Sequence, residues 1–146
     1  MPFRGDMALV GAMAHRVADL AAVPDRALGR IGFNLRAELE HEFAEGVDPY
    51  DRPWEPLAPS TEARGRHAPP LTDTGFMRGT VETEQVERGV MLSIPHPALP
   101  HQDGWSGPQG RGPARPLVPT DGPSERWRDA VAEAVSVEMA AAMGAK

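Results

Sequence analysis

Cysteine is absent from the 146 residues, and lysine occurs only once, at Lys146. Without cysteine the chain can form neither a disulfide nor a thiolate nucleophile. No apolar run approaches the roughly 20 residues that a membrane-spanning helix needs, and charged residues interrupt the N-terminal segment before a signal-like core can form. We therefore expect a protein without a membrane segment that is soluble and intracellular when it is made.

Positive charge is also scarce. Lys and Arg total 15 against 21 Asp and Glu, which gives a formal net charge of −6. A general nucleic-acid binder presents a basic face to the phosphates. The charge balance argues against that class, and we expect no sequence-specific contact with DNA.

Proline and glycine are abundant, with 16 and 15 copies, while 40% of the residues are hydrophobic. This combination predicts one folded domain, 1–146, that carries unusually long loops. The stretch "DPYDRPWEPLAPSTEARGRHAPPLTDTG", residues 48–75, is rich in proline but also contains Trp54, Leu57 and Leu71. A disordered linker has no need of these apolar side chains, so we expect this stretch to pack against something.

Apolar residues spaced by three and four predict three helices, over 7–22, 25–45 and 123–143. Gly46 is a natural end for the second helix, because glycine adopts the left-handed conformation at little cost. The apolar stripe of the second helix consists of Leu28, Ile31, Leu35, Leu39 and Phe43. The stripe of the third consists of Trp127, Val131, Val135 and Met139.

The segment between the second and third helices is expected to form strands and loops. Alternating side chains over 80–94 predict a β-hairpin with its turn at Arg88-Gly89. Loops are expected over 46–79 and 95–113, and an edge strand over 114–119. The predicted fold class is α+β: long N-terminal helices and a C-terminal helix packed on a small, mostly antiparallel sheet, with long Pro/Gly-rich loops.

Few residues suggest chemistry. His96, His101 and Asp103 lie close enough in the sequence for a metal site or an acid/base pair, which leaves a small metal-dependent hydrolase as an alternative function. Metal-binding histidines usually have a spacing fixed by a helix or a tight turn, and a proline-broken spacing of five is not of that kind. We therefore expect no catalytic residue, no cofactor and no metal.

An acidic run follows the middle of the second predicted helix. Charges that alternate along a helix usually form its solvated face, and this is the interpretation we give the run. It could in principle bind cations instead. The residues concerned are Glu38, Glu40, Glu42, Glu45, Asp48 and Asp51.

Four short motifs occur in order along the chain. The first is W-x-P-L-x-x-x-T at 54–61, the second P-L-x-D-T-G at 70–75, the third H-Q-x-G at 101–104, and the fourth P-A-R-P-L at 113–117. In this order and spacing the chain resembles the phage virion morphogenesis family, the tail-completion and neck proteins of which the G protein of phage Mu is a member. The resemblance covers roughly 28–139. Its departures are Phe76-Met77, Thr80, Pro97-Ala98 and Leu117, where relatives have Leu, Ser, Tyr-Ala and Phe.

The resemblance implies a structural virion protein and no enzyme. Such a protein completes the tail and joins it to the head as a homo-oligomeric ring, a hexamer to match the tail, around a channel that DNA crosses. Its partners would be the tail tube or tail terminator and the head-connector proteins, and it would be found in the virion after assembly in the host cytoplasm. A head-completion or stopper protein of the same connector is the alternative within this class.

A ring protein acts through its surfaces, so the candidate functional residues are interface residues. Proline-stiffened loops with apolar anchors suit this role, because a stiff loop loses less entropy on docking. Trp54 and Leu71 could anchor a neighbour or pack within their own fold, and Arg115 could pair with a carboxylate of an adjacent subunit or of its own. The candidates are Trp54, Leu57, Leu71, His101, Trp105 and Arg115.

Overall fold

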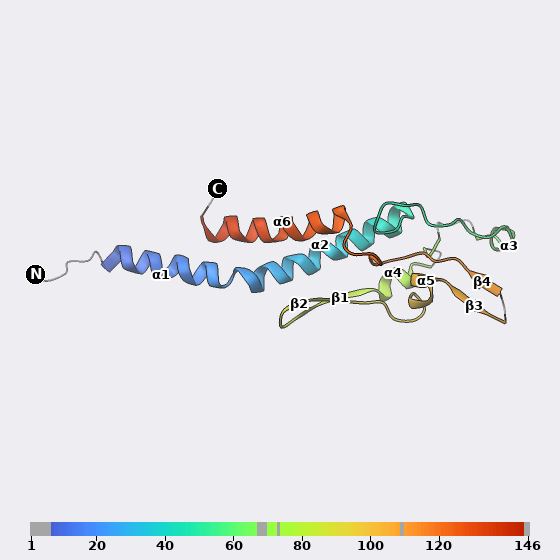
Figure 1. Cartoon of the computed structure of the whole chain (residues 1–146), viewed down its shortest axis with the longest axis horizontal. Coiled ribbons are helices and arrows are strands. Elements are labelled where there is room, and N and C mark those ends of the chain that lie inside the picture. Colours follow the sequence, from blue (N-terminus) through green and yellow to red (C-terminus); the bar gives the residue numbers. More distant parts are fainter. Residues whose placement is uncertain (1–6, 67–69, 73, 109, 145–146) are drawn as a thin grey trace, which may run out of the picture.

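Three long helices form the main axis of the protein in the computed structural model, which describes residues 7–66, 70–72, 74–108 and 110–144, with the side chains of 7–10 not described. They are α1 (Met7–Ala21), α2 (Val23–Glu45) and α6 (Glu125–Ala142). Figure 1 shows α6 lying along α2, with a β-hairpin on the other side of α2 and the loops gathered at the end opposite α1. The predicted α+β class is confirmed. Among the described residues, no helix has both the length and the apolar content to cross a bilayer.

Helix α2 organises the core. It begins at Val23, two residues before the predicted start, because Pro24 lies in the first turn, where a missing N–H costs no hydrogen bond. It ends at Gly46, whose φ of 67° is left-handed and whose N–H donates to the carbonyl of Glu42. The buried core comprises Leu35, Leu39, Phe43, Trp54, Leu71, Val81, Ala98, Leu117 and Trp127.

Helix α6 packs on α2 through a face that differs from the predicted stripe. Its N-cap is Ser124, whose side chain accepts a hydrogen bond from the N–H of Trp127. After Trp127 the buried positions lie one residue before those of the predicted stripe, about 100° around the helix, so Val131 and Val135 are only half-buried and Met139 is exposed. The residues buried on α6 are Trp127, Ala130, Ala134, Glu138 and Ala142.

The hairpin forms from β1 (Glu82–Val86) and β2 (Gly89–Ser93), within the predicted range. Its antiparallel register pairs Val86 with Gly89, so the two-residue turn is Glu87-Arg88, one position earlier than expected. Val90 and Leu92 pack against the core on the side of α2.

Both predicted loops contain short elements. In 46–79 these are α3 (Pro59–Glu62) and α4 (Phe76–Thr80); in 95–113 they are α5 (Leu99–Asp103), β3 (Trp105–Gly107) and β4 (Gly110–Gly112). Two of these helices have proline in the first turn, where proline is tolerated, so the prolines taken as loop signals start helices instead.

The expected strand at 114–119 is wrong, because no strand forms there. The prolines at 113, 116 and 119 remove the N–H donors that a ladder needs. The amide of Gln102 takes the place of a neighbouring strand. Its Oε1 accepts from the N–H groups of Leu117 (2.8 Å) and Val118 (3.2 Å), and its Nε2 donates to the carbonyl of Val118 (2.9 Å).

Candidate protein interface

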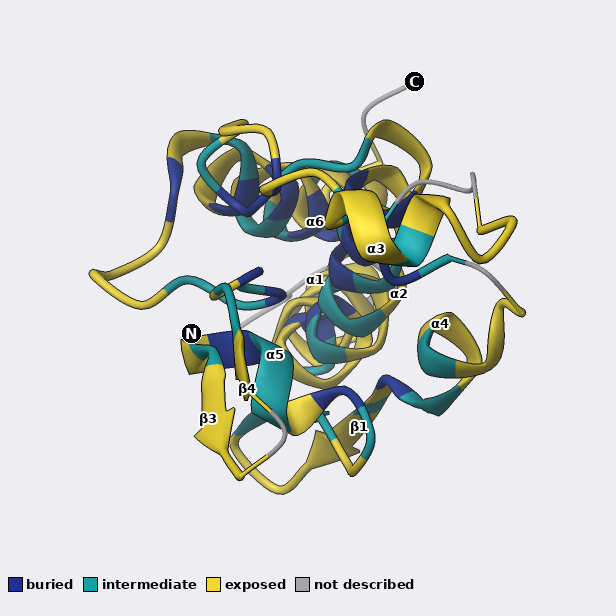
Figure 2. Cartoon of the chain, turned by 90° about the vertical axis from the view of Figure 1, so that its right-hand side faces the viewer, coloured by how far each residue is buried: buried dark blue, intermediate teal, exposed yellow. Residues whose placement is uncertain are grey.

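A groove of about 900 Å³ opens at the end of the protein opposite α1, where the two long loops meet. Figure 2 looks onto this end, with α3, α4, α5 and the β3–β4 ribbon around it. Five of the six candidate interface residues predicted from the sequence line the groove: Leu57, Leu71, His101, Trp105 and Arg115. The structure thus brings together side chains that lie up to 58 positions apart in the chain.

Trp54 lies behind the groove, in the core. Its ring meets Phe43 edge to face, with centroids 5.8 Å apart at 75°, and its Nε1 donates to the carbonyl of Pro116 at 3.1 Å. Leu71 is also buried in this cluster, although it lines the groove as well. The sequence left two roles open for Trp54 and Leu71, and in the structure both residues pack within their own fold.

Arg115 fastens the two loops to each other. Its Nε donates to the carbonyl of Glu55 at 2.9 Å and its Nη2 to the carbonyl of Pro56 at 3.0 Å, while its main-chain N–H donates to the carbonyl of His101 at 2.6 Å. These partners are main-chain carbonyls and not the carboxylates that the sequence suggested. Burial lowers the pKa of the guanidinium, an effect that the nearby charge of Glu55 opposes.

His101 lies half-buried on α5. Burial lowers the pKa of its imidazole, and the charge of Arg115 lowers it further, so the ring is neutral at pH 7. Its Nδ1 is buried and has no hydrogen-bond partner among the described residues. His96 and Asp103, the other members of the suggested acid/base set, are exposed. Within the described ranges no three His, Asp or Glu side chains are grouped so that they could hold a metal ion.

Trp105 and Leu57 are two apolar residues of the groove lining that remain accessible. Trp105 is 41% exposed and lies so close to Gly112 that a Cβ there would come within 1.9 Å of its Nε1. Gly112 is therefore the residue that allows the indole to lie across the β3–β4 ribbon. Leu57 is half-buried on the facing loop.

Glu42 forms a second polar centre, which the sequence interpretation missed. Its carboxyl is fully buried, with Oε1 accepting from Trp127 Nε1 at 2.9 Å and from Arg126 Nη2 at 3.3 Å. Burial raises the pKa of Glu42 to about 8, although the hydrogen bond from Trp127 and the charge of Arg126 act to lower it. The carboxyl therefore takes up a proton more readily than an exposed glutamate does.

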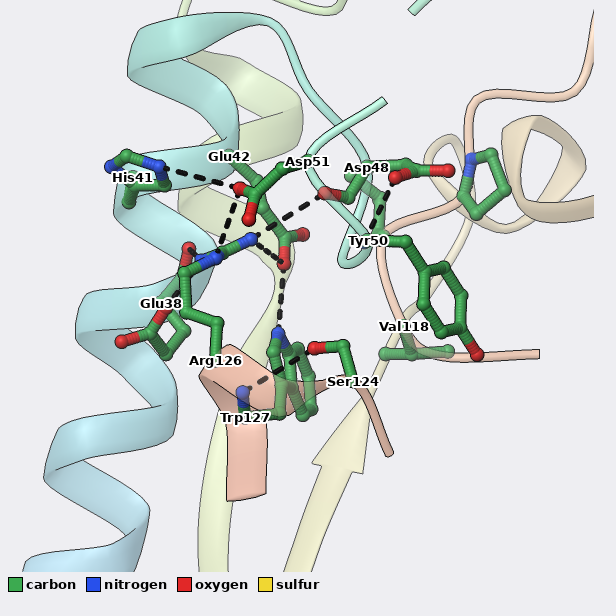
Figure 3. A network of polar contacts seen from close by, with 12 residues as sticks. Glu38, His41, Glu42, Asp48, Tyr50, Asp51, Val118, Ser124, Arg126 and Trp127 are labelled. Carbon is green, nitrogen blue, oxygen red and sulfur yellow. Dashed lines mark hydrogen bonds and ion pairs between the residues drawn. The ribbon is translucent and has the colours of Figure 1, made fainter. Parts of the chain in front are cut away.

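Arg126 connects this carboxyl to its neighbours (Figure 3). It pairs with Glu38, its Nε lies 3.2 Å from Asp51 Oδ1, and its Nη2 donates to the carbonyl of Asp48 at 3.4 Å. The interpretation of the acidic run as a solvated face is wrong for Glu42 and Asp48, which are both buried. A usable signal existed, since Glu42 continues the Leu35–Leu39 stripe at the three-residue step expected of a core position.

The four sequence motifs meet at this end of the protein through direct contacts. The first motif binds the fourth through Trp54 and Arg115, and the third binds the fourth through Gln102. The second contributes Leu71 to the same core, while its Asp73 lies outside the described residues. No family model, curated protein or solved structure matches this chain.

Proposed function

We propose that this protein is a structural component of a phage virion that completes the tail and joins it to the head. In this role it is a ring, a hexamer to match the tail, around the channel through which DNA passes. It acts through contacts with the tail tube or tail terminator on one side and with the head connector on the other. It has no substrate and no cofactor.

The observation that carries the proposal is the connection among the four motifs. Their order along the chain is that of the tail-completion proteins that the sequence resembles. A chance set of short motifs has no reason to be joined by hydrogen bonds, whereas here Arg115 and Gln102 fix three of them to one another. This connection supports a common origin for the motifs as one packed unit.

The charge of the chain supports the same role. A formal charge of −6 suits a ring through which DNA passes, because a basic wall would retain the phosphates and slow the exit of the DNA. The groove adds a concave surface of mixed polar and apolar side chains that a neighbour in the particle can fill.

The test is electron microscopy of particles made by a phage in which this gene is deleted and then restored in trans. The expected result is DNA-filled heads beside unattached tails, with joining restored by the intact gene. Heads that have lost their DNA would instead identify a stopper or head-completion protein. Normal joined particles from the deletion strain would refute the structural role altogether.

A matched pair of variants makes the restoration experiment specific to the groove. Leu57→Asp places a charge on the groove wall, whereas Glu62→Asp changes an exposed residue of α3 that does not line it. We expect the Glu62→Asp gene to restore joining and the Leu57→Asp gene to fail. Equal restoration by both variants would show that the groove is not used.

A further inference from the structure

Helix α1 is an arm that lies beside part of α6 but leaves its side chains from 12 to 21 exposed. Residues 12–21 are all exposed, with Met13 at 59%, Val17 at 66% and Leu20 at 43%. Figure 1 shows α1 continuing the line of α2 beyond the other elements. An isolated helix of 15 residues is marginal in water, so this arm gains stability when its apolar side is covered.

The three exposed apolar residues of the arm are spaced for docking. Met13, Val17 and Leu20 occupy positions i, i+4 and i+7, which lie on one side of a helix. This is the anchor pattern of a helix that lies in a groove of its partner.

The groove at the opposite end is a matching receptor. Its volume of about 900 Å³ is that of a site for one short segment and not of a broad, flat interface. Leu57, Leu71, Met77 and Trp105 supply the apolar part of its lining, which also includes charged side chains. The apolar side chains of this lining can therefore receive the apolar anchors of the arm.

The arm cannot reach the groove of its own chain. Helix α2, with 23 residues, separates them by about 35 Å at 1.5 Å per residue, and α1 points away from the loops. Every copy carries one arm and one groove, so a second copy provides each with an occupant in equal number. Such a contact is heterologous, and repeated contacts of this type form a ring where the rotation closes.

We propose that α1 of one copy docks in the groove of the next copy, with Met13, Val17 and Leu20 inserted between Leu57 and Trp105. The closing of these contacts into a ring rests on the proposed function, whereas the contact itself does not. The arm and the groove are then the two sides of the subunit interface.

Disulfide cross-linking of purified full-length protein tests this contact. Because the chain has no native cysteine, a disulfide can form only between the introduced residues. One chain carries Val17→Cys and a second carries Leu57→Cys. We expect an oxidised dimer only when the two chains are mixed, as a heterologous contact requires. A dimer from Val17→Cys alone would show arm-to-arm pairing, and absence of the mixed dimer would equally overturn the proposal.

The oligomeric state, measured by light scattering, provides an independent test. Val17→Asp is expected to raise the concentration needed for assembly by at least about tenfold, since it removes a buried apolar anchor and buries a charge. Ala12→Asp is the matched control: it is exposed on the same helix about 140° away from Val17, and it should assemble normally. Native protein that remains monomeric at 100 times the protein concentration used for cross-linking would overturn the proposal.

The outcomes separate this inference from the proposed function. A specific mixed cross-link together with normal particles from the deletion strain would retain the arm–groove contact and refute the role in the tail. A Val17→Asp protein that remains monomeric but still restores tail joining would refute a functional arm–groove contact and leave the proposed role intact.

Discussion

Replacement of Glu42 by Gln should stabilise the protein at alkaline pH. The carboxyl is completely buried between α2 and α6, and its pKa is raised from 4.5 to about 8. Gln has the same shape and keeps an oxygen that accepts from Trp127 Nε1 and Arg126 Nη2, but it cannot ionise. The substitution therefore removes the titration and preserves the packing.

The sign and size of this effect on stability follow from proton linkage. The pKa of Glu42 is higher in the folded state than in the unfolded state, so the folded state holds the proton more tightly. The resulting stability is fully present below pH 4.5 and is lost as the pH rises through about 8. At 1.36 kcal/mol per pKa unit, a move from 4.5 to about 8 corresponds to about 5 kcal/mol. Roughly 3 kcal/mol of this falls between pH 6 and pH 9.

Urea unfolding of both proteins at pH 6 and pH 9 measures this difference. We expect the free energy of unfolding of the native protein to fall by roughly 3 kcal/mol relative to that of Glu42→Gln between the two pH values. Glu45→Gln is the control, because it removes an exposed carboxylate from the same helix and should retain the native pH dependence. Parallel pH profiles for the native protein and Glu42→Gln would refute the argument and show that Arg126 keeps the buried carboxylate ionised.

Three further predictions concern the loops and α6. Gln102→Ala removes the partner of the buried Leu117 N–H and should lower the free energy of unfolding by about 2–4 kcal/mol in urea titrations; a loss below about 0.5 kcal/mol would mean that water or a shifted loop replaces the amide. Gly112→Ala should displace the indole of Trp105 and shift the tryptophan emission, because the added Cβ would lie 1.9 Å from Nε1, whereas Gly107→Ala on β3 meets nothing and should leave the spectrum unchanged. For Glu138, hydrogen bonds from Arg30 and Arg26 lower the pKa of the carboxyl, so its contribution is present above the ordinary value near 4.5 and lost as the pH falls below it. Thermal unfolding of Glu138→Gln should therefore show a smaller fall in Tm on acidification than the native protein, and an unchanged fall would contradict this assignment.

The elements that were predictable from the sequence are those determined by local pattern. The stripe that includes Leu35, Leu39 and Phe43 identified α2 and its buried side, and Gly46 identified its end. Alternation of side chains identified the hairpin with its turn one residue out of place. These features depend on residues within one or two turns of each other, so the sequence alone carries the relevant information.

The elements that were not predictable depend on contacts between distant residues. Nothing local shows that Gln102 substitutes for a strand beside 117–118, or that Arg115 bonds to carbonyls about 60 positions away. The burial of Glu42 depends on Trp127, 85 positions later in the chain. The candidate interface residues were found because they are apolar or aromatic side chains in proline-rich loops, whereas the groove that five of them line exists only after the loops pack.

These distant contacts also explain why long loops can provide a binding surface. A free loop loses conformational entropy when it docks, and this loss weakens binding. Here Arg115 and Gln102 hold both loops through part-buried hydrogen bonds within the monomer, and Trp54 joins them to the core beside Phe43. Most of that entropy is therefore lost during folding and not during assembly. If the proposed arm–groove contact forms, a groove already held in place by the fold receives the arm at a lower entropic cost than mobile loops would.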